Sequence, residues 1–267
     1  MLNLKKQSGL TASFKDNVVI FGKGVISEPV TIRTLEEARP YLMDAKATSR
    51  RKNLYLMYRD PHREEDEDVF RNHHVRYDIT VLFPGTIGGK KGEYIKTVGH
   101  THPAPEIYEV LSGEATFVLQ ETKTTEETFV INATAGMKVL IPTGFSHVTV
   151  NTGTKPLILA DLFDDRVKSD YSLLKKRRGA PYWVLPSSLG LQAGLTLAKN
   201  PSYTHKGIVS LGLPNRSETY GVPTDEPLYT AFINHPDTFA FLTDSKKATQ
   251  IFKKGLLFEI KWSGILS

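Results

Sequence analysis

The feature that most constrains the fold is a series of short β-rich segments in the middle of the chain. The series begins with residues 75–83 (VRYDITVLF), which run into Pro84 and Gly85. Strands of this length, interrupted by Gly, Pro, Asn and Asp, are typical of an antiparallel sandwich or barrel. We therefore predict an all-β barrel with strands over residues 75–83, 93–98, 107–111, 115–120, 129–132, 138–141, 147–151 and 157–163.

Two helices are predicted outside this series. Residues 34–44 form the first, with Thr34 as the N-cap ahead of two glutamates. The second begins near Ser169 and ends at Gly179. The chain thereby divides into a mixed leader (1–70) that packs on the barrel, the barrel itself (71–188), and a β-rich extension of unknown role (189–267), with strands over 229–234 and 256–262.

Composition limits the partners and the compartment. The absence of cysteine excludes disulfides, thiolate metal sites and cysteine nucleophiles. Neither a secretory signal nor an apolar stretch of membrane-spanning length is visible, so we expect a cytoplasmic protein without a membrane partner. The net charge of +5 suits an anionic substrate. Because the basic clusters at 46–52 and 175–178 stand apart from each other, we do not expect nucleic-acid binding.

A group of polar residues near position 100 carries the chemistry. His100 and His102 are two residues apart beside a β segment, so their imidazoles face one side. Glu106 follows, and His147 lies in a second spaced segment. Imidazoles with a carboxylate and no thiolate indicate a divalent transition metal such as Mn, Fe, Co, Ni, Cu or Zn. The remaining histidines lack such spacing and are interpreted as surface or loop residues: His62, His73, His74, His205 and His235.

The spacing of both segments resembles the two motifs of the cupin superfamily. The first motif is matched from His100 through Glu106 to Gly113, with Tyr94 where the motif has its leading glycine. The resemblance implies a double-stranded β-helix, which is a jelly-roll-like barrel. The second motif is matched at all its defined positions, by Gly136, Pro142, Gly144, His147 and Asn151.

The flanking segments resemble the cupin-type phosphoglucose (glucose-6-phosphate) isomerases, best known from archaea. Residues 80–85 (TVLFPG), 97–102 (TVGHTH), 106–108 (EIY) and 147–153 (HVTVNTG) are similar to that family's segments. The resemblance covers about residues 10–188, and the extension has no recognised counterpart. The resemblance implies an isomerase of glycolysis and gluconeogenesis that interconverts glucose 6-phosphate and fructose 6-phosphate.

The resemblance also implies a role for individual residues. One divalent metal per subunit (Fe, Mn, Ni or Zn) and a homodimer are expected, with Glu106 and His147 as catalytic residues. Ser169 stands where the family has a histidine. The implied metal ligands are His100, His102, Glu106 and His147; the implied phosphate-binding residues are Tyr55, Thr80, Thr97 and Gly99; and Tyr108 and Tyr171 are expected to line the sugar pocket.

This residue set suits isomerisation, but it leaves alternatives open. A carboxylate can remove a carbon-bound proton, and a metal near O1 and O2 can stabilise the resulting enediolate. Glu106 is a metal ligand, the base, or both. Three other functions remain: a different sugar-phosphate isomerase such as one for mannose 6-phosphate, a cupin dioxygenase with an apolar pocket, or a non-enzymatic sugar- or metal-binding cupin. No ligand-like cluster follows residue 188, so we expect the chemistry not to need the extension.

Overall fold

Two six-stranded sheets form the body of the protein. The computed structural model describes residues 1–123, 127–187, 195–203, 208–253 and 258–263. One sheet, called the β16 sheet here, has the order β11 (His100–Thr101), β16 (Phe145–Asn151), β13 (Glu114–Glu121), β14 (Glu127–Thr134), β20 (Ile208–Pro214) and β21 (Phe258–Ser263). The other, the β8 sheet, has the order β15 (Lys138–Ile141), β12 (Glu106–Ser112), β17 (Leu157–Asp164), β8 (Val75–Leu82), β6 (Asn53–Arg59) and β5 (Thr31–Thr34).

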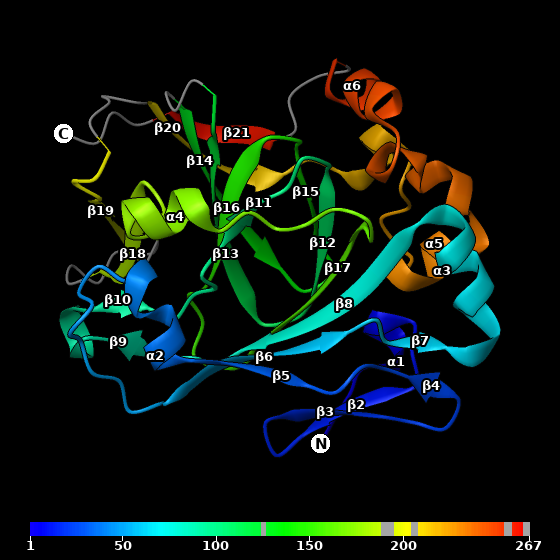
Figure 1. The fold of residues 1–267 in the computed structure, drawn as a ribbon, viewed down its shortest axis with the longest axis horizontal. Coiled ribbons are helices and arrows are strands. Elements are labelled where there is room, and N and C mark those ends of the chain that lie inside the picture. Colours follow the sequence, from blue (N-terminus) through cyan, green and yellow to red (C-terminus); the bar gives the residue numbers. More distant parts are fainter. Residues whose placement is uncertain (124–126, 188–194, 204–207, 254–257, 264–267) are drawn as a thin grey trace.

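The chain alternates between the two sheets, which gives the barrel its topology. β12 lies in the β8 sheet, and β13 and β14 lie in the β16 sheet. β15 then returns to the β8 sheet, and β16 lies again in the β16 sheet (Figure 1). Apart from β14–β20, the pairs within both sheets are antiparallel. The predicted jelly-roll-like β barrel is confirmed.

Most predicted strands lie within two or three residues of those observed, and one differs. Only β10 (Glu93–Tyr94) is a strand within the predicted segment 93–98, and it pairs with β9 (Thr86–Ile87). The residues after it make spaced hydrogen bonds to β16, such as Thr97 N to Thr149 O, instead of a continuous ladder. Lys96 in this segment is buried, and its charge is balanced by Glu93 at 2.7 Å.

Both predicted helices exist, although the first is shorter and in two parts. Thr34 caps α2 (Leu35–Ala38) through a capping box with Glu37. A 3-10 turn at Arg39–Tyr41 follows, since Pro40 has no N–H to continue the α-helix. α4 (Ser172–Arg177) ends before Gly179, whose φ is +104°; a Cβ there would lie 2.7 Å from Tyr41 O.

Small elements of the leader cover one end of the β8 sheet. They are the three-stranded sheet β1 (Leu2–Asn3), β2 (Ala12–Lys15) and β3 (Val18–Phe21), the pair β4 (Val25–Ile26) and β7 (His62–Arg63), and the helices α1 (Lys5–Ser8) and α3 (Glu67–His73). The leader also supplies β5 and β6 to the β8 sheet itself. The sheets thus cross both predicted domain boundaries, at 70 and at 188, which stay predictions.

The extension contains more helix than the sequence suggested. Its elements include, in chain order, β19 (Leu195–Lys199), β20, α5 (Leu228–Asn234), a 3-10 helix at Pro236–Leu242, α6 (Ser245–Lys253) and β21. β19 pairs with β18 (Tyr182–Pro186), which lies before the predicted boundary at 188. The prediction of a strand over 229–234 is wrong, because Leu228 and Phe232 bury one helical face. The predicted strand at 256–262 matches β21 in part; residues 256 and 257 lie outside the described residues. Among the described residues, no helix has the length and apolarity to cross a bilayer.

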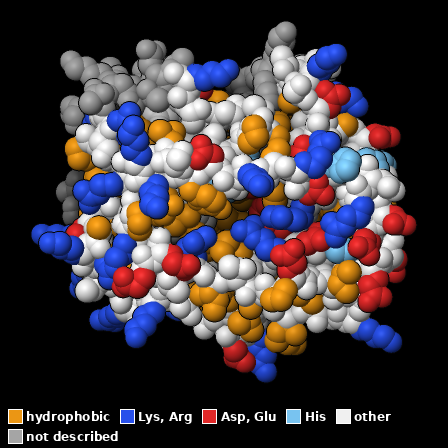
Figure 2. All heavy atoms as spheres, in the orientation of Figure 1, with side chains coloured by type: hydrophobic (Ala, Val, Ile, Leu, Met, Phe, Trp, Pro, Cys, Tyr) orange, Lys and Arg blue, Asp and Glu red, His pale blue; other side chains and the backbone are white. Residues whose placement is uncertain are grey.

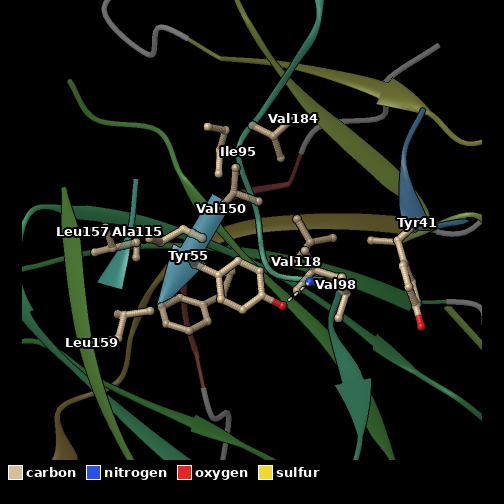
Figure 3. Packing of buried hydrophobic residues seen from close by; sticks show 14 of the residues in the cluster. Tyr41, Tyr55, Ile95, Val98, Ala115, Val118, Val150, Leu157, Leu159 and Val184 are labelled. Carbon is tan, nitrogen blue, oxygen red and sulfur yellow. Dashed lines mark hydrogen bonds between the residues drawn. The ribbon is translucent and has the colours of Figure 1, made fainter. Parts of the chain in front are cut away.

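The β8 sheet separates two hydrophobic cores. The inner core lies between the sheets and includes Tyr55, Val98 and Val150, which pack together in Figure 3. The outer core lies on the opposite face, where the ring of Tyr77 of β8 packs on Tyr229 of α5 beside apolar residues of α3 and the 3-10 helix. Alternating residues of β8 therefore serve opposite faces. Covering the outer face is the structural role of residues 228–242.

One histidine prediction is wrong. His62 is buried, with 3% of its surface exposed, and its Nδ1 lies 2.7 Å from Asp60 O. The ring packs on Phe70 of the outer core. His74 and His235 are exposed as expected, His73 is half-buried, and His205 lies outside the described residues.

Candidate active site

The four predicted metal-binding residues meet at one end of the barrel. His100 on β11 pairs with His147 on β16, and Glu106 begins β12. Glu106 Oε2 lies 3.3 Å from His100 Nε2, 3.0 Å from His102 Nδ1 and 3.3 Å from His147 Nε2. The donor atoms of His100, His102 and Glu106 all lie within 4.8 Å of one another. The structure brings the four side chains together; metal coordination by them stays a prediction.

Backbone geometry explains this convergence. Gly99 has a φ of +73°, and a Cβ there would lie 2.5 Å from His147 O. Glycine at this position therefore lets β11 approach β16 closely enough for His100 and His147 to pair. Two hydrogen bonds between the backbones of Thr101 and Asp170 hold the following loop over the same site.

The protonation states suit a divalent cation. Burial and neighbouring His147 lower the pKa of His100 to about 4, so this imidazole is neutral at pH 7. Burial alone would raise the pKa of Glu106, but His102, together with hydrogen bonds from His100 and His147, holds it well below its usual range. His147 Nδ1 is buried without a hydrogen-bond partner. The neutral imidazole of His100 beside an ionised carboxylate fits a transition metal.

The predicted phosphate-binding residues line the same cavity, which has a volume of about 460 Å³. Tyr55 Oη accepts a hydrogen bond from Val98 N at 3.3 Å (Figure 3), and Thr97 Oγ1 accepts one from Thr149 N at 3.0 Å. Since a hydroxyl also carries one donor hydrogen, both can donate into the cavity. Thr80 and Gly99 complete the wall. Their role in phosphate binding stays a prediction.

Arg33 is a cavity residue that sequence reasoning did not assign a role. It lies on β5 opposite Tyr55 of β6. Its Nε is buried without a hydrogen-bond partner, and its nearest carboxylate, Glu37, is 3.7 Å away. The pairing of β5 with β6 creates this position, so the sequence held no local signal for it beyond the positive charge.

The two predicted sugar-pocket tyrosines also line the cavity. Tyr108 Oη lies 3.1 Å from His147 Nε2, and the ring of Tyr171 packs edge-on against His100 at 5.8 Å between centroids. Ser169, which replaces the histidine of the resemblance, has its Oγ 2.7 Å from His102 Nε2. Tyr108, Tyr171 and Ser169 therefore each contact one histidine of the cluster.

Four charged residues that the sequence did not single out form one wall of the cavity. Arg59, Arg76 and Asp161 line it, and Asp78 joins both arginines. Burial, with Glu106 and Asp78 nearby, raises the pKa of Asp161 well above its usual range. Figure 2 shows the molecule hollowed near the middle of this face, with basic side chains beside the hollow. A charged wall disfavours the apolar pocket expected of a dioxygenase.

The alternating two-sheet barrel, with three histidines and a glutamate gathered at one end, defines a cupin. A family model described as glucose-6-phosphate isomerase matches residues 32–192, which is more than half of the chain. The chain belongs to the glucose-6-phosphate isomerase family.

Individual relatives agree with this assignment. The chain is 26% identical over 184 residues to the glucose-6-phosphate isomerase of Thermococcus litoralis, covering 66% of this chain and 88% of the relative. It is 24% identical over 181 residues to that of Pyrococcus furiosus, covering 65% and 87%.

Among solved structures, Bacillus subtilis oxalate decarboxylase is similar over 43% of this chain and 28% of its own, with 19% identity and a TM-score of 0.34. Pumpkin seed globulin is similar over 43% and 32%, with 15% identity and a TM-score of 0.34.

Proposed function

We propose that this protein is a metal-dependent aldose–ketose isomerase that interconverts glucose 6-phosphate and fructose 6-phosphate. One observation carries the proposal: the Glu106 carboxylate lies within 3.3 Å of nitrogen atoms from three histidines, at the end of a cavity that also holds hydroxyl donors. Relatives that carry the name glucose-6-phosphate isomerase support the substrate. The proposed setting is cytoplasmic glycolysis and gluconeogenesis, and the proposed assembly is a homodimer.

The metal in this proposal is Fe, Mn, Ni or Zn, held by His100, His102, Glu106 and His147. When bound, it would supply a positive charge next to the two oxygens that exchange roles, O1 and O2. Glu106 Oε2 is the atom that removes the proton from C2 of glucose 6-phosphate and returns it to C1 of the enediolate, while the hydroxyl proton of O2 passes to O1. Its low pKa keeps the carboxylate ionised before the proton transfer.

The other residues of the cavity bind and orient the substrate. Tyr55, Thr80, Thr97 and the backbone at Gly99 donate hydrogen bonds to the phosphate, while Arg33 supplies the positive charge that this neutral set lacks. A guanidinium matches a phosphate with two parallel hydrogen bonds. Binding energy from the phosphate then holds C1 and C2 beside Glu106.

A coupled assay tests the proposal. Purified protein loaded with each of the four metals would be incubated with fructose 6-phosphate or mannose 6-phosphate, and formation of glucose 6-phosphate would be followed. We expect turnover of fructose 6-phosphate that chelation abolishes. Failure to form glucose 6-phosphate from fructose 6-phosphate with any of these metals would refute the proposal. If only mannose 6-phosphate were converted, the protein would be an isomerase of mannose 6-phosphate instead.

A further inference from the structure

The charged wall of the cavity contains two aspartates, and only one of them is hydrogen-bonded within the described residues. Asp78 accepts hydrogen bonds from both Arg59 and Arg76, and also from the backbone N–H of Asp60. Asp161 lies on the neighbouring strand, directly opposite Asp78. Over the described parts of the chain, no hydrogen bond and no ion pair within 4.0 Å involves the Asp161 carboxylate.

The Asp161 carboxylate nevertheless faces a place where a ligand would lie. Only 5% of the residue is exposed, and it lines the cavity with Tyr108 and Leu159. A carboxyl group that lines a cavity without a hydrogen-bond partner from the protein can accept hydrogen bonds from the hydroxyl groups of a ligand. Buried inward positions of a barrel usually hold apolar side chains, as Leu159 does two residues away.

Strand register fixes the position of Asp161 along the cavity. Tyr108, Asp161, Asp78 and Arg59 form one row across four strands. The adjacent row on one side contains Glu106, and the adjacent row on the other side contains Thr80. Rows that face the same side are separated by about 6.6 Å along a strand. Asp161 therefore lies midway between the proton-transfer end and the proposed phosphate end.

We propose that Asp161 binds the hydroxyl groups on the middle carbons of the sugar, C3 and C4, and so selects substrates that carry them. This inference rests on the proposed function. With C1 and C2 beside Glu106 and the phosphate of C6 beside Thr80, the carbons between them lie next to the row that holds Asp161. Arg59 and Arg76 fix the wall by holding Asp78, and the carboxyl group of Asp161 stays available to the substrate.

The test compares substrates that contain or lack the recognised groups. Asp161→Ala and Asp161→Asn would be assayed at saturating metal with fructose 6-phosphate and with its 3-deoxy and 4-deoxy analogues, with metal content and melting temperature measured in parallel. We expect Asp161→Ala to lower kcat/KM for fructose 6-phosphate by about 10- to 100-fold, the range for leaving a buried hydrogen-bonding group of the substrate unpaired. The loss should be several-fold smaller for at least one analogue. Asp161→Asn, which keeps one acceptor oxygen, should lose less.

The control is Asp164→Ala, on the same strand but hydrogen-bonded to Arg166 and outside the cavity. It should leave kcat/KM unchanged for all three sugars. If Asp161→Ala does not fold, the test uses Asp161→Asn. The ratio of kcat/KM for fructose 6-phosphate to kcat/KM for each deoxy analogue should then be lower in this variant than in the wild type. Equal losses for all three sugars, or no loss, would overturn the inference while wild-type turnover leaves the proposed function standing. An inactive wild type would overturn both.

Discussion

Ser169 Oγ lies 2.7 Å from His102 Nε2, so a loop residue after β17 holds the imidazole whose other nitrogen faces Glu106. Groups that orient a metal-binding histidine typically contribute 10- to 100-fold to metal affinity. Asp170, next in the chain, fastens this loop to Thr101 through two backbone hydrogen bonds. The loop thereby sets the geometry of the site from outside the cluster.

Ser169→Ala tests this relationship. Losing the hydroxyl should weaken metal binding by about 10- to 100-fold while leaving the fold intact. Metal dissociation measured by competition with a chelator, together with the melting temperature of the metal-free protein, would check it. Ser245→Ala, at the exposed start of α6 and outside the cavity, is the control. Equal metal affinity in both variants would show that Ser169 has no orienting role.

Glu106→Gln tests the proposed base. Turnover should fall by about a hundred- to a thousandfold, because an amide cannot accept the proton. The three histidines should retain most of the metal, and the affinity for substrate should change little because the phosphate is bound elsewhere. Measurement of kcat, metal content and deuterium incorporation from D2O would check these outcomes. Near-normal turnover with metal bound would leave Glu106 as a ligand only; Glu114→Gln, on the exposed start of β13, is the control.

Arg33→Gln tests the charge at the phosphate end. Because Arg33 Nε is buried without a partner beside Tyr55, its guanidinium should bind the phosphate. The substitution should raise KM for fructose 6-phosphate, and Ki for inorganic phosphate, by about 10- to 100-fold. Arg33→Lys should lose less affinity than Arg33→Gln, because lysine keeps the positive charge but lacks the paired N–H donors of the guanidinium. Exposed Arg216→Gln should have no effect; an unchanged Ki in Arg33→Gln would contradict the assignment.

Phe232→Ala tests the role of the extension. Phe232 is fully buried, with its ring 4.9 Å from that of Phe70 across the outer core. Its removal should lower the free energy of unfolding by about 3–5 kcal/mol without changing kcat at a temperature where the protein is folded. Urea denaturation and the coupled assay would measure the two effects. Ile20→Ala, at an exposed position, should cost little. A stable Phe232→Ala protein with reduced kcat would instead link the extension to the chemistry.

The metal-free protein should lose stability in acid. The pKa of His100 is about 4 in the folded state and about 6.5 when unfolded, so the unfolded chain binds its proton first as pH falls. The contribution is fully present above pH 6.5 and declines toward pH 4, by roughly 3 kcal/mol at most. Glu106, with its low pKa, adds a loss below about pH 4.5.

Urea denaturation of the metal-free protein at pH 7, 5.5 and 4.5 would measure this decline. His100→Asn should flatten the part between pH 6.5 and 4.5, because its side chain does not titrate. A free energy of unfolding that does not change between pH 7 and 4.5 would contradict the assigned pKa of His100.

The sequence by itself determined the barrel and the histidine cluster. Local patterns of β-branched residues and turn residues predict the strands. The two spaced segments that contain His100, His102, Glu106 and His147 match at enough defined positions to predict the cluster. The cap at Thr34 was also readable, because a capping box involves only neighbours. These signals are local, or depend on one motif.

Only the tertiary structure decided which distant residues share the cavity and which segments cover the outer face. Arg33 and Asp161 enter the cavity because of the register of β5 on β6 and of β17 on β8, and an inward charged residue looks in sequence like an exposed one. Residues 229–234 have strand-like composition but form α5, because packing Phe232 on Phe70 outweighs a weak local propensity. Contacts between residues far apart in the chain set these features, and no single segment encodes them.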